Sequence, residues 1–273
     1  MRHDRRTSRD SRPDAPRPVF REHSSHEPGP SGSFFIYGRR PVLEALKKGA
    51  VISVQIAKSA HGEIINEIVK SAEERQVPVR QVVDMPEPED VVTQGVTASA
   101  RPPEVRGDLR DFLECLPKDP LPLILMLDGI TDPHNFGAIL RTAEGAGVTA
   151  VIFRERRQAP VTDTVVKASA GAAYLLPLFH VANLAQTVRL LKDAGLWIVA
   201  SVGEEGIPAW NYDWDRPATL IVGAEGAGVS DLLLRDADDA VKIPMYGHIE
   251  SLNVSVATGV LLFEAARKRT QIT

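Results

Sequence analysis

Short apolar runs of strand length alternate along the chain with segments whose apolar residues recur at helical spacing. In the first part of this pattern, the strand-like runs are FFIYG, VISVQIA, VPVRQVV and VTASA, and the helix-like segments are RPVLEALKKG and EIINEIVKSAEERQ. Such alternation is typical of α/β domains. We therefore predict a small α/β domain over residues 34–105.

After residue 120 the strand-like runs are apolar at almost every position: LILML, TAVIF, LWIVASV, TLIVG and AVKIP. Between and after them lie the helix-like segments NFGAILRTAEGAG, DTVVKASAG, LAQTVRLLKDAG, SDLLLRDA and VSVATGVLLFEAARKR. Strands that are apolar on both faces belong in parallel sheets covered by helices. We predict a doubly wound α/β domain over residues 121–273, with ligands at the carboxyl ends of its strands.

Two segments do not follow the α/β pattern. Residues 1–33 are rich in Arg, Ser, Pro, Asp and His and almost free of large apolar residues. Such a segment cannot bury enough surface to offset the entropy of ordering, so we predict a disordered arm. Residues 106–120 are charged and proline-rich around the short amphipathic piece DLRDFLECL, and we predict an interdomain linker there.

Composition narrows the class of protein. The chain has 273 residues, of which 43% are hydrophobic and 25% charged, so it is long enough for two medium globular domains. The single cysteine, Cys115, cannot form an internal disulfide, and the N-terminus lacks a secretory signal pattern. No apolar run reaches the ~20 residues that span a bilayer. We therefore expect a cytoplasmic protein without a membrane partner.

Charge bears on nucleic-acid binding. The formal net charge of -4 argues against a broadly basic RNA-binding surface. Arginine clusters nevertheless occur at Arg39-Arg40, around Arg154 to Arg157, and at Arg267 to Arg269. Each cluster could contact RNA or lie on a solvated surface, and the sequence leaves both interpretations open.

Three blocks in the second domain carry candidate chemistry. The first block, LDGITDPHNFGAILRTAEGAG, lies where a strand ends and a helix begins. Asn135 and Arg141 lie six residues apart, and we expect them to fall on roughly one side of that helix. The block is also compatible with an ordinary capped helix in which Arg141 pairs with Glu144.

The second block, TLIVGAEGAGVS, reads as a buried strand, a glycine-rich loop and a helix. Glycines let the main chain approach a ligand and present its N–H groups. The spacing G-x-x-G-x-G differs from the dinucleotide fingerprint, which argues against a nicotinamide-dependent dehydrogenase. Glu225 within the loop disfavours a phosphate and favours a neutral or cationic ligand such as a sulfonium.

The third block, VKIPMYGHIESLNVSVATGVLLFEAARKR, reads as a strand end, a loop and an apolar helix. Ser251 and Asn253 are both candidate N-caps, although a helix needs only one. The small residues VSVATG favour tight packing against another helix or a second subunit. His134 and His248 have no further ligands at metal-binding spacing, so we predict no metal site.

In order, the blocks read D-P-x-N-x-G-x-x-x-R-T-A, V-G-x-E-G-x-G and I-P-M-x-G-x-x-x-S-L-N-V-S-V-A. This order and spacing resembles the SpoU/TrmH family of SPOUT methyltransferases. YGRRPVLEALKKG and the domain after it resemble the L30e-like RNA-binding domain that some members carry. The resemblance implies an S-adenosylmethionine-dependent RNA 2′-O-ribose methyltransferase with a parallel-sheet domain, a C-terminal trefoil knot and a homodimeric state. It further implies a guanosine of large-subunit (23S) rRNA as the target.

The resemblance also implies site residues, position by position. The catalytic positions of the family fall on Asn135, Arg141, Glu225, Ser251 and Asn253. The cofactor contacts fall on Ala200, Ser201, Gly223, Ile243, Met245 and Leu252. Because a guanidinium almost never loses its proton near neutral pH, we expect Arg141 to orient a substrate phosphate or stabilise the developing alkoxide. Asn135 and Glu225 are expected to hold Arg141.

Two other functions stay open at this point. A tRNA ribose methyltransferase would use the same residues, because the L30e-like domain argues for rRNA only by analogy. A non-catalytic RNA-binding assembly factor that retains a methyltransferase fold is disfavoured, since Asn135, Arg141 and Asn253 are all present.

Overall fold

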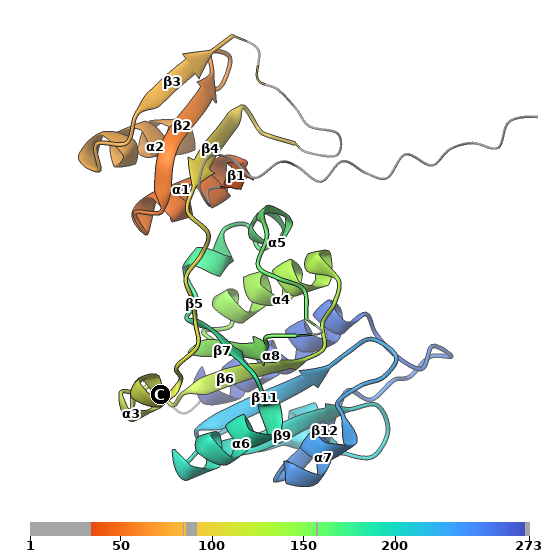
Figure 1. Cartoon of the computed structure of the whole chain (residues 1–273). Helices are drawn as coiled ribbons and strands as arrows, with labels where there is room; N and C mark the ends of the chain where they lie inside the picture. Colours follow the sequence, from red (N-terminus) through yellow and green to blue (C-terminus); the bar gives the residue numbers. More distant parts are fainter. Residues whose placement is uncertain (1–33, 84, 86–91, 157, 271–273) are drawn as a thin grey trace, which may run out of the picture.

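The computed structural model describes residues 34–83, 85, 92–156 and 158–270. The arm predicted over residues 1–33 therefore lies outside the described residues. The chain forms a four-stranded sheet followed by an eight-stranded sheet, which lie in separate parts of the molecule in Figure 1.

The smaller sheet has the strand order β1-β4-β2-β3. Its strands are β1 (Phe34–Tyr37), β2 (Val51–Ala57), β3 (Val79–Val82) and β4 (Val96–Ala100), and its helices are α1 (Arg39–Lys47) and α2 (Glu63–Glu74). Strand β4 pairs antiparallel with β1 and β2, whereas β2 and β3 are parallel. Both helices bury apolar residues, including Leu43, Leu46 and Ile68. All six elements lie where the sequence pattern predicts them.

The larger sheet has the order β10-β12-β9-β11-β6-β7-β8-β5, and every neighbouring pair is parallel. Its strands are β5 (Val105–Arg106), β6 (Leu123–Asp128), β7 (Ala150–Arg154), β8 (Leu178–Val181), β9 (Trp197–Val202), β10 (Ile207–Pro208), β11 (Ala218–Gly223) and β12 (Asp239–Lys242). The chain runs from β6 through β7 to β8 and then crosses to β9, so the direction of winding reverses beside β6. The implied trefoil knot stays a prediction.

Helices cover both faces of this sheet. One face carries α4 (Pro133–Gly145), α5 (Asp163–Ala168) and α8 (Val254–Thr270), with the 3-10 turns η1 (Ala172–Tyr174) and η2 (Ala209–Asn211). The other carries α3 (Arg110–Glu114), α6 (Leu184–Asp193) and α7 (Asp231–Asp236). Along β6, Leu123, Leu125 and Leu127 face the first layer, and Ile124 and Met126 face the second. The predicted parallel sheet with two buried faces is confirmed.

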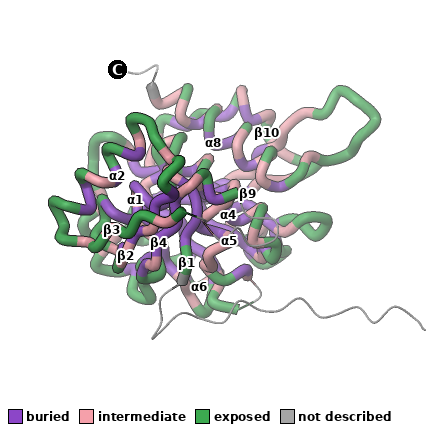
Figure 2. Tube along the Cα trace, turned by 90° about the horizontal axis from the view of Figure 1, so that it is seen from above, coloured by how far each residue is buried: buried purple, intermediate pink, exposed green. Residues whose placement is uncertain are grey.

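Burial is continuous from one sheet to the other. A single cluster of buried apolar side chains includes residues of both sheets, and Figure 2 shows the buried positions gathered inside the trace. Helix α5 lies against β1, and η1 lies against α1. The Tyr174 hydroxyl donates a hydrogen bond of 2.9 Å to the Arg101 carbonyl. Among the described residues, no helix is both long and apolar enough to cross a membrane.

Parts of residues 106–120, the predicted linker, pack on the larger sheet. Strand β5 pairs with β8 at the sheet edge, and Leu109 is buried in the second core layer. The Phe112 ring packs against Phe179 in a tilted arrangement with 4.9 Å between ring centroids. Strands β5, β8 and β10 are absent from the sequence prediction, because each is short and β8 directly follows Pro177.

The basic cluster at the end of α8 includes one structural arginine. Arg269 donates hydrogen bonds of 2.7 to 3.2 Å to the carbonyls of Leu121, Trp214 and Arg216. Burial lowers the pKa of its guanidinium to about 10, which leaves the group charged at neutral pH. Arg269 thus ties the C-terminal helix to the segments that lead into β6 and β11, a role that neither sequence interpretation of this cluster included.

Gly137 in α4 faces α5 too closely to carry a side chain. A Cβ atom there would lie 2.4 Å from Ala168 Cβ and 2.8 Å from the Val165 carbonyl oxygen. We expect Gly137→Ala to lower the free energy of unfolding in urea by about 1–3 kcal/mol, because α4 and α5 must separate. Gly145→Ala in the same helix is the control, since its Cβ would meet only Phe263 at 3.8 Å. Equal stability of the two variants would contradict this account.

Candidate active site

A cavity of about 570 Å³ opens at the carboxyl ends of β9, β11 and β12. Its walls also include the loop after β11 and the segment that leads into α8. Val222, Ile243 and Leu252 provide apolar surface, and the carboxylates of Glu204 and Glu250 belong to residues of the lining. Doubly wound sheets bind their ligands at this edge, next to the strand where the winding reverses.

The glycine-rich loop after β11 is closed on itself. The Gly228 N–H donates a hydrogen bond of 2.8 Å to the Ala224 carbonyl, and the two residues form an isolated β-bridge. A Cβ atom on Gly223 would lie 1.9 Å from the Gly228 carbonyl carbon, so only glycine fits there. This close return of the chain places Glu225 in the turn between the two bridged residues.

Asn253 joins the three sequence blocks through one amide group. Its Nδ2 donates to Asn135 Oδ1 at 3.0 Å and to Glu225 Oε1 at 3.1 Å. Its Oδ1 accepts from the Ser255 N–H at 2.9 Å and from the Ser255 hydroxyl at 2.6 Å. The Oδ1 atom of Asn253 therefore binds the first turn of α8, and its Nδ2 group binds the other two blocks. Asn253 is both the N-cap of α8 and the centre of the polar cluster.

The start of α4 is set by its own cap. Asp132 accepts hydrogen bonds of 3.1 Å from the backbone N–H groups of His134 and Asn135, and Pro133 occupies the first turn. A carboxylate cap followed by proline is a strong helix-start signal. It places Asn135 in the first turn of α4, where its side chain meets Asn253.

Arg141 does not join this cluster. Within the described part of the chain, it makes no hydrogen bond or ion pair, and its side chain is exposed. The predicted support of Arg141 by Asn135 and Glu225 is therefore not observed. Six residues of an α-helix turn through about 600°, so Arg141 points roughly 120° away from Asn135 around α4. The alternative pair between Arg141 and Glu144 is not observed either. The guanidinium is free to meet a ligand from outside.

Most predicted cofactor residues line the cavity: Ser201, Gly223, Ile243, Met245 and Leu252, together with Ser251 from the predicted catalytic set. Ala200 does not, because it is fully buried within β9 between β11 and β12. The sequence prediction missed Val202, Gly203, Glu204 and Glu250. The position of the first three at the carboxyl end of a predicted buried strand could have indicated them. In the described ranges, no group of three or more His, Cys, Asp or Glu side chains could hold a metal ion.

The chain matches two protein families in adjacent regions. Residues 122–263 match the SpoU rRNA Methylase family. Residues 35–106 match the family described as RNA 2′-O ribose methyltransferase substrate binding. The first match contains the cavity and the polar cluster, and the second contains the smaller sheet.

Similar proteins cover nearly the whole chain. The 23S rRNA (guanosine-2′-O-)-methyltransferase RlmB of Pseudomonas aeruginosa is 41% identical over 87% of this chain and 97% of its own length. A Staphylococcus saprophyticus protein, named for the TrmH family and for tRNA/rRNA methylation, is 39% identical over 87% of this chain and 96% of its own. The AdoMet-bound rRNA methyltransferase of Sinorhizobium meliloti superposes with a TM-score of 0.69 at 26% identity, covering 87% and 88% of the two chains.

The residues of the cavity fit S-adenosylmethionine as a cofactor. Apolar walls suit a flat aromatic base, and the glycine loop leaves main-chain groups accessible. Glu204 and Glu250 in the lining favour a ligand with positive charge, such as a sulfonium with an ammonium group.

Asn253→Asp separates the two roles of Asn253. An aspartate still caps α8, but it cannot donate to Asn135 and it brings a second carboxylate to Glu225. We expect the free energy of unfolding to stay within about 0.5 kcal/mol of the wild type. Methyl transfer should fall at least about tenfold, because the hydrogen bonds that join the three blocks are lost.

The control is Asn183→Asp at the N-cap of α6, where Oδ1 of Asn183 accepts from two backbone N–H groups. This variant should change neither stability nor methyl transfer. Wild-type methyl transfer by Asn253→Asp would show that the polar cluster has no part in the reaction.

Three blocks far apart in the sequence converge on one cavity at the carboxyl ends of the parallel strands, where the sequence predicts a ligand. The fold, the block order and the near full-length similarity agree with one another. The chain therefore belongs to the SpoU rRNA methylase family, and it is an S-adenosylmethionine-dependent methyltransferase that carries the substrate-binding domain of that family.

Proposed function

We propose that this protein methylates the 2′-hydroxyl of a guanosine ribose in 23S rRNA, with S-adenosylmethionine as the methyl donor. The observation that carries the proposal is the cluster of Asn135, Asn253 and Glu225 beside the cavity. The name of the Pseudomonas aeruginosa relative supports the choice of substrate. Residues 34–105 bind the RNA and residues 121–273 carry out the transfer, in the cytoplasm where rRNA is made.

Bound S-adenosylmethionine supplies a methyl group on a positively charged sulfur, which makes that carbon electrophilic. Gly223, Ile243 and Leu252 would hold the cofactor through main-chain and apolar contacts, and Ser201 and Met245 belong to the same cavity lining. Ser251 shapes the part of the cavity nearest Asn253. Ala200 contributes by fixing the strand from which Ser201 emerges.

The chain must also place the ribose hydroxyl in line with the methyl group. Correct placement of two reactants supplies a large part of the acceleration in such displacements. Arg141 is exposed and unpaired among the described residues, so it is available to bind an RNA phosphate or the developing alkoxide. A guanidinium keeps its proton, and the hydroxyl proton therefore passes to a phosphate oxygen or to water.

The proposed homodimer forms through α8. Val256, Val260 and Phe263 are 52%, 39% and 53% exposed and recur at positions i, i+4 and i+7 of this helix. Residues at this spacing share one helix face. Tyr246 and Ile249 add exposed apolar surface just before the helix. A self-complementary apolar stripe of this kind is buried when a second copy docks across a two-fold axis.

A tRNA ribose 2′-O-methyltransferase is the second candidate. The name of the Staphylococcus saprophyticus relative includes tRNA as well as rRNA, and the residues of the site do not distinguish the two. A non-catalytic assembly factor is a weaker candidate, because the cavity and the polar cluster are both complete.

The test is methyl incorporation from labelled S-adenosylmethionine into protein-free 23S rRNA and, in parallel, into tRNA. We expect one labelled 2′-O-methylguanosine in the rRNA, and no label with Arg141→Ala as the inactive reference. Label in tRNA alone would establish the second candidate. No label in either RNA, despite cofactor binding, would indicate an assembled-particle substrate or a non-catalytic role, and full activity of Arg141→Ala would remove Arg141 from the mechanism.

We expect the wild type to be a dimer and Phe263→Glu to be a monomer in analytical ultracentrifugation. A carboxylate at this position of the stripe would be desolvated without a partner in the dimer. Ile52→Glu is the control, because Ile52 is similarly exposed, at 47%, but lies on β2 of the smaller sheet. A dimeric Phe263→Glu variant would exclude α8 as the interface.

A further inference from the structure

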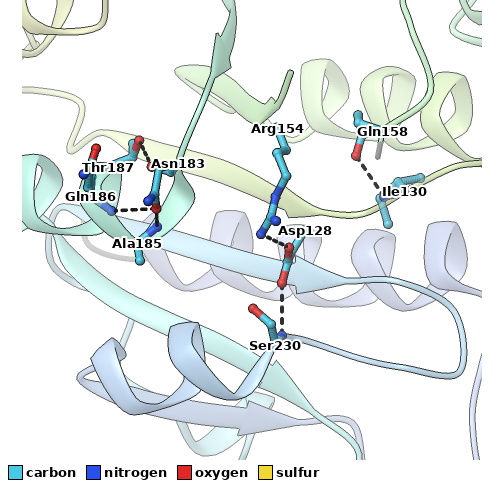
Figure 3. Close-up of polar contacts among 9 residues, drawn as sticks. All are labelled: Asp128, Ile130, Arg154, Gln158, Asn183, Ala185, Gln186, Thr187 and Ser230. Atoms are coloured by element: carbon cyan, nitrogen blue, oxygen red, sulfur yellow. Dashed lines mark hydrogen bonds and ion pairs between the residues drawn. The ribbon is translucent and has the colours of Figure 1, made fainter. Parts of the chain in front are cut away.

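Asp128 is a buried carboxylate outside the cavity lining. It is the last residue of β6 and only 8% exposed. Its Oδ1 accepts a hydrogen bond of 3.0 Å from Arg154 Nη2, and its Oδ2 accepts one of 3.0 Å from the Ser230 N–H. Figure 3 shows the carboxylate between the two donors, which come from the end of β7 and the start of α7.

Asp128 contacts both ends of the glycine-rich loop. Its side chain binds the end of the loop, and its backbone lies beside the start. In the parallel pairing of β6 with β11, Asp128 is the register partner of Gly223, where the loop begins. Ser230, where the loop ends, donates its backbone N–H to the Asp128 side chain. The Ser230 side chain makes no capping bond for α7, whereas its backbone N–H binds the carboxylate at the end of β6.

Arg154 pairs with this carboxylate and holds it in place. A carboxylate this deeply buried is costly unless it is paired with a cation. The pairing leaves Arg154 Nε buried without a hydrogen-bond partner. Both carboxylate oxygens are used, one by Arg154 and one by the Ser230 N–H. The group fixes the end of β7 and the start of α7 relative to β6.

The loop held in this way carries two functional features. Gly223 lines the cavity, and Glu225 accepts the hydrogen bond from Asn253. Movement of the loop end at Ser230 would displace both the cavity wall and the polar cluster.

We propose that Asp128, fixed by Arg154, is a positioning residue that holds the glycine-rich loop in the geometry that binds S-adenosylmethionine. It acts through the loop and contacts neither the reacting groups nor the cofactor. The inference rests on the cofactor assigned above, and it adds two residues that the sequence resemblance did not mark as part of the site.

The test measures cofactor affinity and loop protection separately. Asp128→Ala removes both acceptors, and Asp128→Asn keeps one acceptor for the Ser230 N–H but loses the charge that holds Arg154. We expect the Kd for S-adenosylmethionine, by titration calorimetry, to rise roughly ten- to hundredfold in Asp128→Ala and less in Asp128→Asn, as for the loss of a charged hydrogen bond. Hydrogen exchange of the apo protein should show the Ser230 amide protected in the wild type and exposed in Asp128→Ala.

Asp238 provides a matched control at the amino ends of β9 and β12. It also joins a cation to a backbone N–H, accepting from Lys192 Nζ at 2.7 Å and from the Ile198 N–H at 2.9 Å. Asp238→Ala therefore removes the same kinds of bond at the end of α7 opposite the loop, where β9 and β12 begin. It should lower thermal stability while leaving the Kd for S-adenosylmethionine within about twofold of the wild type.

Three results would overturn the inference: wild-type affinity in Asp128→Ala, an equal loss of affinity in Asp238→Ala, or unchanged exchange at Ser230. If Asp128→Ala does not fold, Asp128→Asn decides alone, and wild-type values for both its affinity and its Ser230 exchange would overturn the inference. A wild-type protein that binds no S-adenosylmethionine would instead overturn the proposed function, and the inference with it.

Discussion

The parallel pairing of β6 with β11 is the interaction on which the active site depends. Both strands are buried along their whole length, so their register is set by core packing on two faces. That register places Gly223 beside Asp128, and it brings the loop after β11 next to the start of α4. The catalytic edge is therefore a consequence of how the two central strands pair.

The side-chain amide at position 253 both accepts hydrogen bonds and donates two. A carboxylate has no proton to donate, and a hydroxyl has only one. The Asn253 amide accepts hydrogen bonds from the first turn of α8 and donates to Asn135 and Glu225. The packing of α8 against α4 brings the third block within reach of the first. Because the same side chain starts the helix and joins the blocks, the fold of the C-terminal segment and the geometry of the site are coupled.

The polar groups around this edge fall into two sets. Asn135, Glu225 and Asn253 are on the side of the sheet that carries α4 and α8, whereas Asp128 and Arg154 point toward the layer of α6 and α7. The glycine-rich loop runs between the two sets and is held by both. Arg141 stays outside both networks, which leaves its exposed guanidinium available for the proposed contact with the substrate.

Local pattern was sufficient for the central strands and for the six elements of the smaller sheet, because apolar periodicity, caps and glycine placement are properties of neighbouring residues. The residues that converge on the cavity were indicated by the resemblance of the three blocks to a known family. The partner of each polar side chain was decided only in three dimensions. Asn253 rather than Arg141 engages Asn135 and Glu225, Ala200 is buried between strands, and Arg269 fastens the C-terminal helix. Strand order and register bring these groups together over long separations, and no local period encodes either of them.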